Sequence, residues 1–157
     1  MTAPSLNTFA HTLRIYWEDT DAGGVVFYAN YLKFFERART EWLRSFGYAQ
    51  EELRTTTGAI FIVSQTSVRY LRPARLDDLL TVTVDVQHAG LASMNIAQVA
   101  WRGNERLAEG EIRIGCVDAQ SFRPRRIPEH LLQAMTEQVP GLALSPTASS
   151  KNKGFAE

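Results

Sequence analysis

The sequence predicts an α+β protein in which an antiparallel sheet curls around one long helix. An apolar stretch at residues 30–46 repeats at helical spacing, and after Gly58 the pattern changes to four strand-like segments in series. Strands in series favour an antiparallel sheet over a doubly wound parallel one. The length of 157 residues is that of one ordinary domain.

The first predicted element is a strand at residues 11–17, where Leu13, Ile15 and Trp17 alternate on one side. An acidic, glycine-bearing loop follows at residues 18–26, with the sequence EDTDAGGVV. We expect this loop to connect the strand to the long helix.

The long helix is predicted over residues 30–46, with Gly47 placed to end it. Leu32 widens the apolar stripe, so we expect the helix to be mostly enclosed. A short second helix is expected at residues 49–55. The stripe itself consists of Tyr31, Phe34, Phe35, Ala38, Trp42 and Leu43.

The second half of the chain is predicted to form long strands and a final helix. Ala89-Gly90 and Gly103-Asn104 are short enough for hairpin turns, whereas the segment 72–75 is interpreted as shaping a longer turn. A helix is expected at residues 128–139, with a proline in its first turn. The strands are expected at residues 59–71, 78–88, 91–102 and 106–117.

The domain limits follow from composition. Residues 1–10 are small and polar and are expected to be flexible, and residues 141–157 are expected to be a disordered tail. The domain between them covers residues 11–140. A single sheet around one helix leaves open edge strands, so we expect a homodimer or a homotetramer.

Composition excludes several classes of protein. Seventeen basic residues balance seventeen acidic ones, which argues against nucleic acid as the main partner. Cys116 is the only cysteine, and the three histidines show no metal-ligand spacing, so no disulfide and no metal site is expected. No signal peptide and no apolar run of about 20 residues is present, so we expect a cytoplasmic protein without a membrane span.

Common catalytic motifs are missing as well. The sequence contains no G-x-S-x-G, no phosphate-binding P-loop and no G-x-G-x-x-G. Cys116 lies in an apolar alternating strand, where we expect a core residue rather than a nucleophile. A conventional serine or cysteine hydrolase is therefore not predicted.

The loop at residues 18–26 has two interpretations. Its three carboxylates, Glu18, Asp19 and Asp21, would be unremarkable in a solvated turn. However, the loop lies between an apolar strand and an enclosed helix, where surroundings tune the ionisation of a carboxylate. The helix start supplies free backbone N–H groups, which favour an oxyanion. One carboxylate beside such a helix start is sufficient for acyl transfer.

Residues 16–43, with the sequence YWEDTDAGGVVFYANYLKFFERARTEWL, resemble the signature of hot-dog acyl-CoA thioesterases. The subgroup that they resemble most is the Tol-Pal-associated one, related to 4-hydroxybenzoyl-CoA thioesterase. Weaker agreement continues through residues 61–63, 70–78 and 116–118, so that the resemblance covers about residues 11–135. It implies the hot-dog fold, an antiparallel sheet wrapped around one long central helix.

The resemblance also implies roles for particular residues. Asp21 matches the catalytic carboxylate, as nucleophile or general base, and Tyr28 matches the residue whose backbone N–H polarises the thioester carbonyl. Asp19 and Gly24 are expected to shape the loop, with Gly24 at the substrate. Many Tol-Pal-associated members carry histidine where this chain has Tyr28, which leaves the subgroup and the acyl preference open.

Three further substrate-binding residues are implied. Glu36 matches a carboxylate that receives a substrate hydroxyl, although pairing with a nearby helix arginine is an alternative. Ser93 and Arg123 match positions that face coenzyme A, and a solvated basic loop at residues 123–126 is the alternative for Arg123.

Together these observations predict an acyl-CoA thioesterase that forms free acid and CoA and needs no metal or redox cofactor. The resemblance places its active site between two subunits. A hot-dog dehydratase would pair histidine with a carboxylate, and no such pair is visible. The alternative is a non-catalytic module that binds acyl carrier protein or a Tol-Pal partner.

Overall fold

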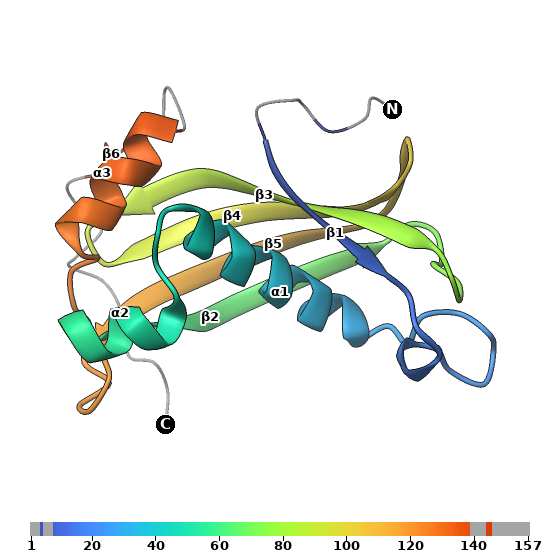
Figure 1. Ribbon diagram of the computed structural model, residues 1–157, viewed down its shortest axis with the longest axis horizontal. Helices are drawn as coiled ribbons and strands as arrows, with labels where there is room; N and C mark the ends of the chain where they lie inside the picture. The colour runs from blue at the N-terminus through green and yellow to red at the C-terminus, as the bar shows by residue number, and fades with distance from the viewer. Residues whose placement is uncertain (1–3, 5–7, 139–143, 146–157) are drawn as a thin grey trace. The chain divides into compact units, whose positions relative to one another are not determined.

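The computed structural model of the chain describes residues 4, 8–138 and 144–145, and Figure 1 shows the order of its elements. The predicted flexible start therefore lies partly outside the described residues, and Phe9 and Ala10 already belong to the first strand. Of the predicted tail, only strand β6 (Leu144–Ser145) is described, and it pairs in parallel with Ala89 and Gly90.

The first strand ends earlier than predicted. Strand β1 (Phe9–Arg14) pairs antiparallel with strand β3 (Leu79–Gly90), from Phe9 opposite Val84 to Arg14 opposite Leu79. The chain then makes the 3-10 turn η1 (Trp17–Asp19), and Trp17 is 83% exposed instead of facing the core.

The long helix is confirmed. Helix α1 (Asn30–Ser45) ends one residue before the predicted limit, and its six predicted stripe residues are all buried. Leu32 is 44% exposed, so the buried stripe is narrower than predicted. The buried Gln98 side chain donates to the Phe35 carbonyl oxygen at 3.1 Å and so connects α1 to strand β4 (Ser93–Arg102).

The sheet has the strand order β1-β3-β4-β5-β2, with β6 also on β3. Its long strands are β2 (Ala59–Tyr70), β3 (Leu79–Gly90), β4 (Ser93–Arg102) and β5 (Glu105–Asp118). Because β3, β4 and β5 are consecutive neighbours joined by two-residue turns, they run antiparallel, as predicted.

One hairpin turn is confirmed at Gly103-Asn104, and the other is displaced. The turn between β3 and β4 falls at Leu91-Ala92, because Ala89 and Gly90 are buried and remain in the sheet. The shorter helices are α2 (Gln50–Thr57) and α3 (Glu129–Gln138), each within two residues of the predicted limits.

The chain groups into two compact units by its internal contacts. One unit consists of Met1–Trp42, Ser67–Asp85 and Ala97–Glu111, and the other of Leu43–Thr66, Val86–Ile96 and Ile112–Glu157. Each of the four long strands contributes residues to both units. The single domain at residues 11–140 stays a prediction, because contacts within each unit do not test it.

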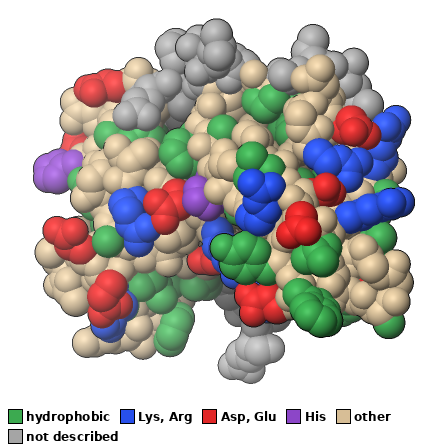
Figure 2. All heavy atoms as spheres, turned by 45° about the vertical axis from the view of Figure 1, so that its right-hand side comes forward, with side chains coloured by type: hydrophobic (Ala, Val, Ile, Leu, Met, Phe, Trp, Pro, Cys, Tyr) green, Lys and Arg blue, Asp and Glu red, His purple; other side chains and the backbone are tan. Residues whose placement is uncertain are grey.

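Charges of both signs are mixed on the face drawn in Figure 2, where Lys and Arg alternate with Asp, Glu and hydrophobic side chains. This mixture agrees with the equal numbers of basic and acidic residues. Among the described residues, no helix is both long enough and apolar enough to cross a membrane.

Candidate active site

The acidic loop at residues 18–26, in the unit that contains Met1–Trp42, is held at both ends by Asp19. The buried Asp19 carboxylate accepts the Tyr16 backbone N–H at 2.8 Å, which ends β1 and fixes the turn η1. The Asp19 carbonyl oxygen accepts two further donors, the backbone N–H of Phe27 and the Asn30 side-chain amide, each at 2.9 Å. Asp19 thus shapes the loop, as predicted, and Asn30 fixes the helix start to it.

Asp21 lies in a tight turn at the tip of this loop. Its backbone N–H donates to the Val25 carbonyl oxygen at 2.9 Å, and its carbonyl oxygen accepts the Gly24 N–H at 3.0 Å. Its side-chain Oδ1 accepts the Gly23 N–H at 2.8 Å. Gly24 has a φ of +78°, which a side chain would disfavour.

The Asp21 carboxylate is exposed, and only one of its two oxygens accepts a hydrogen bond within the described part of the chain. Oδ1 accepts one hydrogen bond, and Oδ2 has no donor among the described residues. A Cβ atom on Gly23 would lie 3.1 Å from Oδ1, so glycine gives the carboxylate the space for this orientation. The loop therefore presents a fixed carboxylate with a free oxygen.

The chain enters α1 through an irregular first turn. Asn30 donates its N–H to the Phe27 carbonyl oxygen at 2.9 Å, and Leu32 donates to Ala29 at 3.1 Å. The Tyr28 N–H has no acceptor within the described part of the chain. Free N–H groups at a helix start carry partial positive charge and stabilise negative charge in front of them.

Tyr70, at the end of β2, is a site residue that the sequence analysis missed. Its hydroxyl donates to the Tyr28 carbonyl oxygen at 2.9 Å. Its ring contacts those of Tyr28 and Tyr31, with centroids 6.2 Å and 5.5 Å apart. Burial raises the pKa of the Tyr70 hydroxyl. No local pattern signals the contact, because 42 residues separate Tyr70 from Tyr28.

The turn after β2 also packs on this loop. Ala74 accepts the Val26 N–H at 2.8 Å and donates its own N–H to the Tyr31 hydroxyl at 3.2 Å. Arg75 forms a β-bridge with Val25. Tyr31 therefore packs the helix start against the turn that follows β2.

Glu36 lies farther along α1. It is exposed, its carboxylate accepts the Thr40 hydroxyl at 3.0 Å, and it lies about 9 Å along the helix axis from Asn30. Among the described residues it forms no ion pair with an arginine. Burial lowers the pKa of Arg39, and the charge of Glu36 acts in the opposite direction.

Ser93 and Arg123 belong to the second unit. Ser93 is half-buried and follows the Leu91-Ala92 turn. That turn is bonded to the chain on both sides of Arg123, because Ala92 accepts the Cys116 N–H at 2.8 Å and Leu91 accepts the Ile127 N–H at 2.7 Å. The exposed Arg123 guanidinium has no ion-pair partner in the described residues. The structure therefore brings the segments of Ser93 and Arg123 together.

Within residues 8–138 and 144–145, no group of three or more His, Cys, Asp or Glu side chains is arranged to hold a metal ion. Burial raises the pKa of the Cys116 thiol to about 11, and its Sγ lies 3.7 Å from the Arg126 carbonyl oxygen. Cys116 is thus a core residue, as predicted.

Comparison with known proteins gives consistent results. Residues 15–135 match the thioesterase-like superfamily. The acyl-CoA thioesterase YbgC of Haemophilus influenzae is 38% identical over 128 residues, which cover 82% of this chain and 94% of that protein. The acyl-CoA thioester hydrolase YbgC of Escherichia coli O6:H1 is 39% identical over 125 residues, covering 79% and 92%. The crystal structure of a probable thioesterase from Bartonella henselae superposes with a TM-score of 0.74 at 31% identity, covering 77% and 99%.

Proposed function

The chain belongs to the thioesterase-like superfamily, has the hot-dog fold and hydrolyses acyl-CoA thioesters, and we propose that Asp21 and the backbone N–H of Tyr28 perform this hydrolysis. The observation that carries the proposal is an exposed carboxylate with a free oxygen in the same bonded loop as an unpartnered N–H. Thr20 opposite Val26 and Asp21 bonded to Val25 fold this loop back on itself.

The reaction has two routes in which Asp21 acts differently. In one, an Asp21 oxygen attacks the thioester carbon, the C–S bond breaks with release of CoA thiolate, and water then hydrolyses the acyl anhydride. In the other, Asp21 accepts a proton from water, the water oxygen attacks the same carbon, and the C–S bond then breaks with release of CoA thiolate. In both, negative charge develops on the carbonyl oxygen, and the Tyr28 N–H donates to it.

Tyr70 is a positioning residue in this scheme. Its hydroxyl holds the Tyr28 carbonyl oxygen and so restrains the backbone that presents the Tyr28 N–H. The Tyr28 ring is 64% exposed, and its side chain has no assigned part in the chemistry.

The remaining proposed contacts concern substrate binding. Gly24 would let the loop approach the thioester, and Glu36 would accept a hydroxyl of the acyl group. Ser93 and Arg123 would face coenzyme A, which their bonded segments and the unpaired Arg123 guanidinium support.

We further propose a homodimer or homotetramer, with the active site between subunits. Support comes from β2, which ends the strand order and whose residues 63–67 are exposed, as for an edge strand that pairs with another chain. Light scattering should give two or four times the chain mass of 17.6 kDa, and a monomer at micromolar concentration would contradict this arrangement.

The experiment that tests the catalytic assignment is thiol release from short, long, branched and aromatic acyl-CoAs. Asp21→Asn preserves the size of the side chain and removes its charge and basicity, so kcat should fall by about 100-fold or more with the fold intact. Glu18→Gln, in the same exposed loop, is the matched control and should retain activity.

Two results would contradict the assignment. If Asp21→Asn is as active as the native chain, Asp21 is not catalytic. If the native chain releases no thiol but retains acyl carrier protein, the binding-module alternative is correct. We propose that the protein acts in the cytoplasm. Because the proposed reaction uses only a carboxylate, water and a backbone donor, dialysis against a chelator should leave kcat unchanged.

A further inference from the structure

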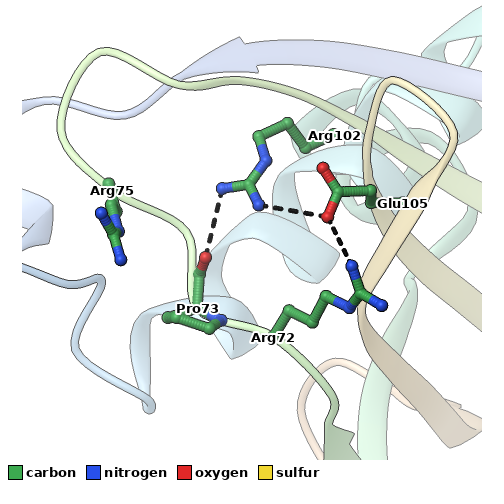
Figure 3. Close-up of a pocket in the computed structure, with 5 residues that line it drawn as sticks. All are labelled: Arg72, Pro73, Arg75, Arg102 and Glu105. Atoms are coloured by element: carbon green, nitrogen blue, oxygen red, sulfur yellow. Dashed lines mark hydrogen bonds and ion pairs between the residues drawn. The ribbon is translucent and has the colours of Figure 1, made fainter.

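A hollow of about 500 Å³ lies next to the acidic loop at residues 18–26, and the function proposed above does not use it. Figure 3 shows its lining, which comes from the turn after β2, the end of β4 and the start of β5. The lining residues are Arg72, Pro73, Arg75, Arg102 and Glu105.

Arg102 is the fixed part of this hollow. Its guanidinium contacts Asp78 at 2.8 Å, the Pro73 carbonyl oxygen at 3.2 Å and Glu105 at 3.5 Å. Its pKa is raised, chiefly by the hydrogen bond to Asp78. These contacts tie the turn after β2 to the end of β4, so Arg102 serves the structure first.

The side chains of Arg72 and Arg75 make fewer contacts with the protein than that of Arg102. Arg72 pairs with Glu105 at 2.9 Å, but both side chains are about half exposed, and such pairs contribute little and exchange readily. The Arg75 guanidinium has no hydrogen bond or ion pair in the described residues, and it lies on the other side of Pro73 from Glu105 (Figure 3).

The charges in the hollow do not cancel. The lining carries three guanidinium groups and the Glu105 carboxylate, and Asp78, which pairs with Arg102, adds a second carboxylate, so one positive charge is in excess. At the margin, the exposed Asp77 adds a carboxylate, and Arg14, which donates to the Asp77 carbonyl oxygen at 2.8 Å, adds a cation.

The backbone of the hollow's lining is bonded to the acidic loop. Arg75 forms a β-bridge with Val25, and Val25 accepts the Asp21 backbone N–H at 2.9 Å. The backbone that carries Arg75 is therefore joined to the Asp21 turn through Val25.

We propose that this hollow binds a phosphate or diphosphate group, held by Arg75 and by Arg72 after it releases Glu105. Guanidinium groups suit this ligand because their paired N–H donors match two phosphate oxygens. The volume exceeds that of one phosphate and leaves room for the group attached to it. The ligand belongs either to the acyl-CoA substrate, in which case the inference rests on the function proposed above, or to a separate phosphate compound.

The test of the site itself is calorimetric titration with inorganic pyrophosphate, which needs no turnover. Native protein should bind it, and Arg75→Ala should weaken binding by about tenfold or more, the loss expected for charge-assisted hydrogen bonds. Because the Arg75 side chain has no hydrogen bond or ion pair to lose, and only its charge acts on Asp78, the variant should fold normally. Arg37→Ala, which removes an equally exposed arginine from α1, is the matched control and should bind like the native chain.

Two outcomes of this titration would overturn the site. Either the native protein fails to bind pyrophosphate, or Arg37→Ala and Arg75→Ala weaken binding equally, which indicates general charge attraction. Neither outcome bears on the Asp21 assignment, since thiol release is measured separately.

The source of the phosphate is decided by comparing acyl-CoA with the matching acyl-pantetheine, which lacks phosphate. If the site holds the phosphates of the substrate, Arg75→Ala raises KM about tenfold for acyl-CoA alone. If it holds a separate compound, both KM values stay unchanged and pyrophosphate still binds at saturating CoA. An equal rise of KM for both substrates contradicts the proposal, because Arg75 then acts through the Asp21 loop.

Discussion

Two aspartates in this chain begin turns of similar local form, Asp21 in the acidic loop and Asp118 at the end of β5. Asp21 accepts the N–H of Gly23, two residues on, at 2.8 Å. Asp118 likewise accepts the N–H of Gln120, two residues on, at 3.0 Å. Beyond this shared contact the two carboxylates differ.

Asp118 uses most of its acceptor capacity within the protein. Oδ1 also accepts the Ser121 backbone N–H at 2.9 Å and the Ser121 hydroxyl at 3.2 Å, and Oδ2 contacts the Arg125 guanidinium at 3.2 Å. The Ser121 and Gln120 N–H groups hold the pKa of Asp118 below its usual value. Asp21 keeps a free oxygen, so what distinguishes a candidate catalytic carboxylate here is the capacity that its own turn leaves unused.

The largest effect expected from this difference is a reversal of two readouts. Asp21→Asn should lower kcat by about 100-fold or more and leave the midpoint of thermal unfolding nearly unchanged. Asp118→Asn should lower that midpoint and keep kcat within a few-fold of native, since it removes the negative charge that the turn N–H groups and Arg125 stabilise. Thiol release and thermal unfolding of both variants measure this, and an equal loss of kcat would erase the distinction.

A second prediction concerns the backbone N–H of Tyr28, the proposed donor to the thioester carbonyl oxygen. Tyr70→Phe removes the hydrogen bond to the Tyr28 carbonyl oxygen, worth about 0.5–1.5 kcal/mol, so kcat should fall by up to about tenfold at unchanged KM. Tyr28→Phe is the matched control and should change kcat less than about twofold, because only its backbone donates. A rise in KM without loss of kcat for Tyr70→Phe would mean that Tyr70 binds substrate instead.

Glycine substitutions separate loop geometry from general strain. Gly24 and Gly47 both have positive φ, +78° and +89°, with open space where a Cβ atom would lie, so Ala at either should cost about 1–2 kcal/mol of stability. Only Gly24→Ala should also lower kcat, by roughly tenfold, because it tilts the turn that orients Asp21. Denaturant unfolding and kcat of the two variants test this, and normal turnover in Gly24→Ala would show that the turn tolerates distortion.

The lowered pKa of Asp118 gives a pH dependence. Its folded pKa lies below the unfolded one, so its stabilising contribution is complete above the ordinary carboxyl value of about 4 and is lost as pH falls through the folded pKa. The stability difference between native protein and Asp118→Asn should therefore be constant near pH 7 and shrink below about pH 4. A difference that stays constant to pH 2 would show that the ion pair and turn contacts do not depend on the charge.

Much of the fold could be predicted because periodic burial sets it. The apolar stripe of α1 and the four long strands were placed within a few residues, since each pattern persists over two or more turns or pleats. The prediction that Trp17 faces the core was wrong. The alternation of apolar residues in the sequence continues past the point where the Asp19 carboxylate accepts the Tyr16 N–H and the chain turns. Such a capping contact leaves no trace in hydrophobic periodicity.

The candidate site divides in the same way. Asp21, Gly24 and Tyr28 fall in one continuous segment, so that a resemblance over that segment could identify them. The contacts of Tyr70 and the lining of the hollow depend on chain segments that only the sheet topology brings together. An exposed arginine in a turn gives no local sign of its neighbours.

The smallest expected effect concerns Cys116, which lies just before Asp118 at the end of β5. Its thiol has a pKa of about 11, so at pH 8 only about one side chain in a thousand is a thiolate, the reactive form. Iodoacetamide should therefore modify the folded protein far more slowly than the unfolded chain, and Cys116→Ala should keep native kcat. If modification of the folded protein is rapid and stops thiol release, then the end of β5 contributes to the chemistry, and the contrast between the Asp21 and Asp118 turns is incomplete.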